Sequence, residues 1–135
     1  MASQFTLGAI PTGLLPSQMK LAEPTATATL SAANSFNAIV RGVPTAAATY
    51  TTATAADIVS AIGGDCEVGT AFMLVVINAS AGANTITVQG GSGVTVSGVP
   101  TVAQNASKVF LGRVTDTLTE AITLYGLGSV AAAAA

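Results

Sequence analysis

The sequence predicts an all-β protein, an antiparallel β-sandwich of jelly-roll-like form with one short helix and an extended N-terminal arm. Three observations lead to this expectation. Short segments rich in Val, Ile and Thr recur between clusters of turn residues. One of them, Phe72–Asn78, is apolar at both parities, which is typical of a strand buried on both faces. Only one segment carries helix signals at both of its ends.

Strand signals run along most of the chain after residue 24. In Thr85–Gln89 the alternation points Ile86 and Val88 inward and the polar residues outward. The glycines of Gly90–Gly93 are expected to make a hairpin bend before the next strand. No strict repeat is visible, so a solenoid is not expected. The expected strands are Thr25–Leu30, Phe36–Val43, Phe72–Asn78, Thr85–Gln89, Val94–Ser97, Val99–Ala103, Lys108–Thr115 and Ala121–Leu127.

One helix is expected, over Ala55–Ile62. The Thr54 hydroxyl can accept a hydrogen bond from the amide of Asp57, and the Asp57 carboxylate suits the positive end of the helix dipole. Gly63 and Gly64 then end the helix.

The chain is expected to divide into an N-terminal arm (residues 1–24), a β-sandwich domain (25–130) and an alanine tail (131–135). Prolines in the arm prevent a continuous helix or central strand, although the arm is apolar. Such a segment either packs along its own domain or reaches a neighbouring subunit, where it can add a strand to an exposed edge. The arm residues predicted to form an interface are Phe5, Leu7, Ile10, Leu14 and Leu15.

Composition indicates a protein that associates. Only 7% of the 135 residues are charged, against about a quarter in ordinary soluble domains. We therefore expect much of the surface to face other protein, including further copies of this chain. Nucleic acid is not an expected partner, because the net charge is −2 and the cations Lys20, Arg41, Lys108 and Arg113 are scattered singly.

Synthesis in the cytoplasm is expected, with no membrane partner. The N-terminus lacks the basic region of a signal peptide. The longest apolar run, Ala71–Ile77, is far short of the roughly 20 residues that span a bilayer.

No catalytic, cofactor-binding or metal site is expected. The chain has no histidine, which removes the commonest general base and metal ligand. Asp65, Cys66 and Glu67 are interpreted as a solvated turn, with the single cysteine more often buried than exposed in such a setting. The glycines of Gly90–Gly93 do not indicate a phosphate loop, because a strand pattern follows them rather than a helix. The two sequons at Asn78 and Asn105 are interpreted as turns.

Threonine-rich strands raise one further possibility. Thr25–Thr29 and Thr85–Thr87 have the Thr-x-Thr pattern found on ice-binding surfaces. Such a surface needs the pattern repeated in register across stacked turns, and the sequence shows no period that would supply it. Ordinary solvent-facing threonines of β-strands explain the same residues.

Six short motifs follow one another over Thr54–Gly128, a little over half of the chain. They are TAADIVSAI (54–62), VGTAF (68–72), NASAGANTITV (78–88), GVTVSG (93–98), AQNASK (103–108) and AITLYGLG (121–128). In this order and spacing the segment resembles domains of tailed-bacteriophage virion proteins, in particular capsid decoration (cement) proteins and fibre-like proteins.

The resemblance implies an all-β homotrimer on the outside of a virion, bound to the major capsid protein, with no catalytic residue. A tail fibre, spike or other receptor-side module is the alternative within the same family. A free-standing binding protein, lectin-like or ice-binding, is a third interpretation from a different class.

Overall fold

The computed structural model describes residues 18–128 of the chain. Within them lie ten strands and one helix. In chain order these are β1 (Lys20–Ala22), β2 (Ala28–Thr29), β3 (Ala38–Gly42), β4 (Ala48–Thr51), α2 (Ala55–Ile62), β5 (Ala71–Asn78), β6 (Ile86–Gln89), β7 (Val94–Ser97), β8 (Thr101–Val102), β9 (Ser107–Asp116) and β10 (Ala121–Leu127). The protein is therefore mostly β with one short helix, as the sequence predicts.

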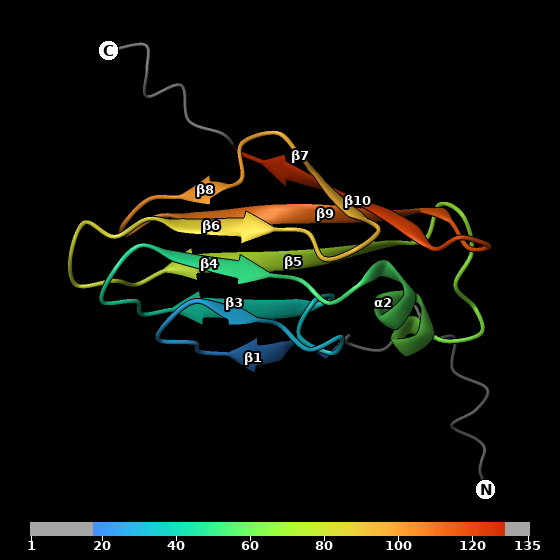
Figure 1. Ribbon diagram of the computed structural model, residues 1–135, viewed down its shortest axis with the longest axis horizontal. Coiled ribbons are helices and arrows are strands. Elements are labelled where there is room, and N and C mark those ends of the chain that lie inside the picture. The colour runs from blue at the N-terminus through green and yellow to red at the C-terminus, as the bar shows by residue number, and fades with distance from the viewer. Residues whose placement is uncertain (1–17, 129–135) are drawn as a thin grey trace, which may run out of the picture.

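The strands form two mixed sheets, which corrects the expected antiparallel arrangement (Figure 1). The six-stranded sheet has the order β1-β3-β5-β9-β10-β7 and the four-stranded sheet the order β2-β4-β6-β8. Strands β1, β3 and β5 are parallel, as are β2, β4 and β6, and β7 is parallel to β10. Antiparallel pairing occurs where β9 meets β5 and β10 and where β8 meets β6. This pattern does not confirm a jelly-roll connectivity, which is built from antiparallel Greek keys.

The parallel pairs arise because the chain winds between the two sheets. From β1 to β6 successive strands lie in opposite sheets, so neighbours within a sheet are separated by a whole turn of chain and point the same way. Ala38 pairs with Lys20, 18 residues before it, and with Leu74, 36 residues after it. The second turn is longer because it contains α2. These unequal turns explain why solenoid-like winding leaves no period in the sequence.

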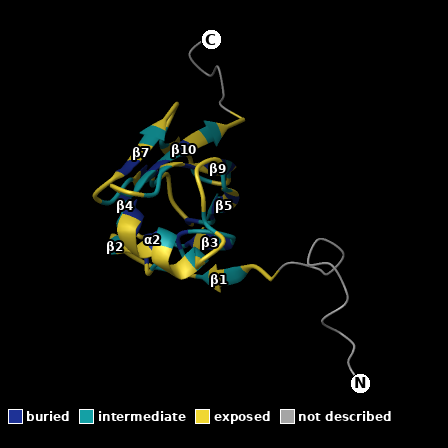
Figure 2. Cartoon of the chain, turned by 90° about the vertical axis from the view of Figure 1, so that its right-hand side faces the viewer, coloured by how far each residue is buried: buried dark blue, intermediate teal, exposed yellow. Residues whose placement is uncertain are grey.

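The core lies between the two sheets. Gly42 of the six-stranded sheet has no side chain, and this leaves room for Tyr50 and Ile86 of the other sheet directly against its backbone. The fully buried Tyr50 donates a hydrogen bond from its hydroxyl to the carbonyl of Pro24 at 3.3 Å, and burial raises its pKa. The largest fully buried side chains come from both sheets and from the helix, and they include Tyr50, Ile58, Leu74, Val76, Ile86, Val88, Phe110, Ile122 and Leu124. Figure 2 shows the buried parts of the chain in dark blue.

Helix α2 is confirmed with the predicted bounds. The Thr54 hydroxyl accepts a hydrogen bond from the amide of Asp57 at 3.1 Å, and Gly63 ends the helix with a φ of 102°. Ala55 and Ile58 are its buried residues. The helix lies at one end of the two layers and not over the outer face of either sheet (Figure 1).

All eight expected strand segments contain strands, although β2 and β8 are only two residues long. Two strands were not predicted. Strand β4 lies in an Ala- and Thr-rich stretch without clear alternation, and β1 lies inside the range 1–24 assigned to the arm, where it pairs with β3. Residues 1–17 of the arm, with the predicted interface residues, and the Ala131–Ala135 tail lie outside the described residues.

The glycine segment Gly90–Gly93 is not a hairpin, because β6 and β7 belong to different sheets. It is a crossover between layers that passes close to the β4–α2 connection. The Gly91 amide donates to the Thr52 hydroxyl at 2.9 Å, and a Cβ on Gly91 would lie 2.6 and 2.7 Å from the carbonyl oxygens of Thr52 and Ala53. Glycine is needed here for a close backbone approach.

We predict that Gly91→Ala lowers the free energy of unfolding by about 1–3 kcal/mol, because backbone atoms must shift to admit the methyl group. Gly64→Ala is the matched control, since a Cβ there meets no atom within 4 Å. Its effect should be at most about 1 kcal/mol and stabilising, through the lower entropy of the unfolded chain. Urea unfolding of both variants measures the difference, and equal stabilities would contradict this packing.

Candidate interaction surfaces

The outer face of the six-stranded sheet carries two adjacent rows of apolar side chains. The first row contains Leu21, Ile39, Val75, Val109 and Leu127, which pair side by side on β1, β3, β5, β9 and β10. The second row contains Met73, Leu111 and Tyr125, paired on β5, β9 and β10, together with Met19 just before β1. We call these nine residues the apolar belt.

Six of the nine belt residues are exposed and Ile39, Val75 and Val109 are half-buried, whereas the opposite side of the same strands is buried. Met73 is 46% exposed and Tyr125 40%, while their chain neighbours Leu74 and Leu124 are at most 1% exposed. The sequence indicates that Phe72–Asn78 is buried on both faces, and within residues 18–128 only the face of Phe72, Leu74 and Val76 is buried. Its second face was expected to be covered by the helix or by a partner subunit, and among residues 18–128 no element covers it. Covering by a partner subunit stays a prediction.

Charged groups border the belt and do not interrupt it. On one side Arg41 and Glu23 form an ion pair at 3.2 Å with both side chains about half exposed. On the other side Arg113 lies one row beyond Leu111 on β9. A flat apolar band with a polar rim is typical of protein interaction surfaces.

At its β1 end the belt contains a shallow hollow of about 320 Å³. Its lining is mostly apolar, and the belt contributes half of it. The lining residues are Met19, Asn37, Ala71, Phe72, Met73 and Leu111. The asparagine is used internally, because its side-chain oxygen accepts a hydrogen bond from the amide of Met73 at 3.2 Å. The hollow therefore favours an apolar group.

The outer face of the four-stranded sheet differs, because it presents threonines. Thr29 pairs with Thr51, and Thr49 with Thr87, which in turn pairs with Thr101. The sequence was expected to lack the register for such ranks, and the parallel stacking of β2, β4 and β6 supplies it. These ranks are short, because the first spans two strands and the second spans three.

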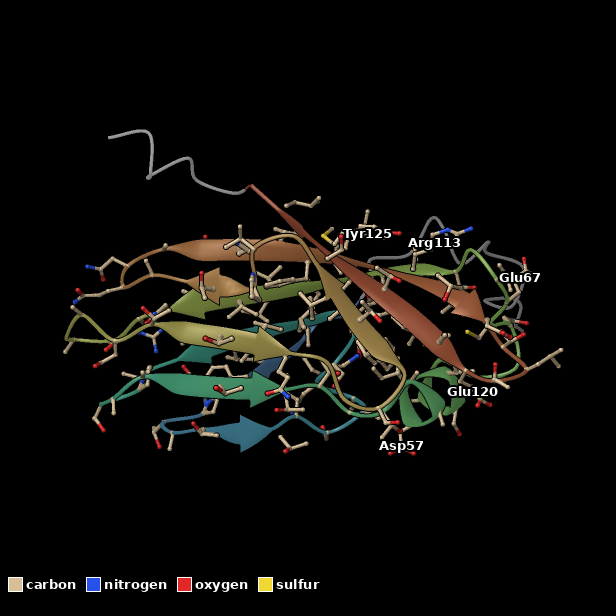
Figure 3. The ribbon with its side chains drawn as sticks, turned by 45° about the horizontal axis from the view of Figure 1, so that its top comes forward. Asp57, Glu67, Arg113, Glu120 and Tyr125 are labelled. Carbon is tan, nitrogen blue, oxygen red and sulfur yellow. The ribbon has the colours of Figure 1, made fainter. Side chains whose placement is uncertain are left out.

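Acidic side chains gather at the end of the molecule that holds α2. Asp57, Glu67 and Glu120 lie at this end (Figure 3). Asp116, in the β9–β10 turn, has its pKa lowered by a hydrogen bond from the amide of Leu118 and by further bonds from the hydroxyl and amide of Thr119. These bonds order the turn and use the carboxylate oxygens locally.

The opposite end is held by a network of uncharged side chains. The Asn78 amide nitrogen donates to the carbonyls of Asn84 at 2.7 Å and Val102 at 2.9 Å, and the Ser80 hydroxyl donates to the carbonyl of Pro44 at 2.8 Å. Asn78 is buried at the end of β5, and its side chain links the β5–β6 loop to the end of β8. Ser80 in the same loop adds the link to Pro44, before β4. Asn105 has a φ of 60° in a turn, as interpreted from the sequence.

Ionisable and thiol groups do not converge in the described part of the chain. Among residues 18–128 no three His, Cys, Asp or Glu side chains could share a metal ion. Asp65 and Glu67 are exposed in the loop after α2, and Cys66 is half-buried against the core. Lys108 was not anticipated as an inward residue, although it shares the parity of Phe110. It is 7% exposed and donates to the carbonyl of Val99 at 2.6 Å.

No known protein family, curated protein or solved structure matches the chain. Among the described residues, no helix has the length and apolar character needed to cross a bilayer. The geometry of the two outer faces therefore carries the functional argument.

Adjacent residues of β10 test whether the belt is surface or core. We predict that Leu124→Ala lowers the free energy of unfolding by about 2–5 kcal/mol, because it leaves a cavity between the sheets. Tyr125→Ser should cost less than about 1 kcal/mol, the value of a cross-strand pair. It should also reduce binding of a hydrophobic dye to the native protein. A loss of stability in Tyr125→Ser as large as in Leu124→Ala would show that the belt is part of the core.

Proposed function

We propose that this protein is a structural virion component, a capsid decoration (cement) protein. It binds the major capsid protein on the outer surface of a tailed-phage head, as a homotrimer, after synthesis in the host cytoplasm. The resemblance of Thr54–Gly128 to phage decoration and fibre-like domains supports this proposal, and so does a chain with few charges. It is a binding role and requires no catalytic group.

The observation that carries the proposal is the apolar belt. Two rows across five strands cover about 300 Å², given a strand spacing near 4.8 Å and about 6.6 Å between alternate residues. A patch of that size is at the scale at which exposed apolar surface marks interaction sites. A surface that extends over five paired strands suits a broad protein partner better than a small ligand.

The size of the belt also limits what it can do alone. Burial of about 300 Å² contributes roughly 7–8 kcal/mol at about 25 cal/mol per Å², before the costs of association. A standard interface buries about 800 Å² on each partner, more than twice the belt. The apolar N-terminal arm is the second contact that we propose, with Phe5, Leu7 and Ile10 in it.

In this mechanism the protein bridges neighbouring capsid subunits after shell expansion and holds them against internal pressure. We take the two layers as a rigid sandwich that transmits the load. The buried Asn78 network ties the loops at one end, and α2 closes the other end. Both features favour a preformed shape, which reduces the entropy lost on binding.

Copy number in purified virions tests the location. A decoration protein should be present at high copy number over the whole head, in a fixed ratio to the major capsid protein, by quantitative mass spectrometry and imaging of intact particles. A few copies confined to the tail would overturn the head assignment and favour the fibre or spike alternative.

Deletion of residues 1–16 tests the role of the arm. The shortened protein should remain folded, because the described core begins at β1, and should lose affinity for particles that lack the native protein. Unchanged binding by a folded deletion variant would contradict a contact made by the arm.

A second candidate function follows from the threonine ranks on β2, β4 and β6. In-register hydroxyls on a flat uncharged sheet are the feature on which ice-binding surfaces depend. If this face binds ice, the free protein inhibits ice recrystallisation, and Thr87→Lys in the middle of the ranks abolishes the effect. The matched variant Thr123→Lys, on the outer face of the other sheet, should retain it. Absence of inhibition by the unmodified protein would exclude this candidate.

A further inference from the structure

We propose that Leu14 and Leu15 bind the hollow of the apolar belt on their own subunit. The arm is then attached to the outer face of the six-stranded sheet before it reaches any partner. The argument uses the position of the hollow, its chemistry, and the length of chain between it and the two leucines.

The hollow lies where the described chain begins. Met19, one residue before β1, forms part of its lining, and the other lining residues come from the β3, β5 and β9 region of the outer face. Met73 and Leu111 are 46% and 38% exposed, so they present apolar surface at this point. An incoming group can reach them without any movement of the core.

The two leucines are within reach of this surface. Leu15 lies four residues before Met19, a distance of at most about 14 Å along an extended chain. Strand β5, which carries Met73, is two strand spacings or about 10 Å from β1. Leu14 and Leu15 can therefore cover the hollow. Phe5 lies ten residues before Leu15, so the short connection to Met19 does not hold it near the hollow.

The short connection favours the same subunit over a neighbouring copy. A tether of three or four residues gives a high effective concentration, and closing so short a loop costs little entropy. Pro16 restricts Leu15 to extended or turn conformations, which suits attachment across the strands better than a helix would. The sides of the hollow are uncharged, which matches the uncharged segment Ile10–Pro16.

This attachment assigns separate roles to the two halves of the arm. Leu14 and Leu15 hold the arm on its own domain, and Phe5, Leu7 and Ile10 remain for a partner. The inference goes beyond the proposed function and does not depend on it, because the attachment exists in the free protein.

Thiol protection in the free full-length chain tests the attachment. Both test variants carry Cys66→Ser. Ala71→Cys places a thiol in the hollow. Leu118→Cys places a thiol on a turn away from the belt, at a position where the leucine side chain is 91% exposed. We expect a bulky maleimide to label position 71 about tenfold more slowly in the full chain than in a chain lacking residues 1–16. Labelling at position 118 should be the same in both.

Two further measurements identify the occupant. Leu14→Ser with Leu15→Ser should remove the protection at position 71, while Phe5→Ser with Leu7→Ser should leave it. The protection should also be independent of protein concentration. Equal labelling with and without the arm, protection that disappears on dilution, or protection that needs Phe5 and Leu7 would each overturn the proposal. Virion binding is a separate measurement, so failure of the proposed function is distinguishable from failure of this attachment.

Discussion

The structure depends on close contact between its two sheets across a narrow core. Gly42 admits Tyr50 and Ile86 directly against the backbone of the six-stranded sheet, and within that sheet Gly112 leaves room for the ring of its partner Phe72. Because the chain has few large side chains, its core must be thin, and such a core is filled only if backbone and ring approach closely. Because strands alternate between the two sheets, every long strand points one set of alternate residues into the core and the other set to the outer face.

The two faces of the molecule differ in the residues that point away from the core. On the four-stranded sheet it holds threonines, which are compatible with water and with β-structure. On the six-stranded sheet it holds the apolar belt, with Arg41, Glu23 and Arg113 only at its borders. The low charge of the chain is thus distributed unevenly, with acidic groups at the α2 end and an apolar band across one face. The proposed binding role of that band rests on the cost of leaving such a surface in water.

The proposed decoration function connects this surface to assembly. A patch of about 300 Å² is small for a stable complex, so many weak contacts, or one patch together with an arm, are needed for firm attachment. In the proposed function a repeating shell supplies the many contacts, and the predicted N-terminal arm (residues 1–24) supplies the second contact. The proposed attachment of Leu14 and Leu15 to the hollow places the end of the arm that joins the domain on the same face as the belt. Both contacts then act on one side of the domain.

The sequence alone determined the local features. The helix follows from the Thr54 cap and the glycines after Ile62, and strand β6 from the alternation of Ile86 and Val88, because both depend on neighbours within one turn or one strand. The apolar residues at both parities of Phe72–Asn78 were also visible in the sequence, where they indicated a strand buried on both faces, and the structure places one of these faces on the surface. Only the tertiary structure decided the strand directions, the winding between sheets and the ranks of belt and threonine residues. Their pairings join residues 14 to 38 positions apart, and the inserted helix makes the turns unequal, so no period in the sequence records them. The direction of a strand depends on which sheet the chain enters next, and that choice is made by packing between layers.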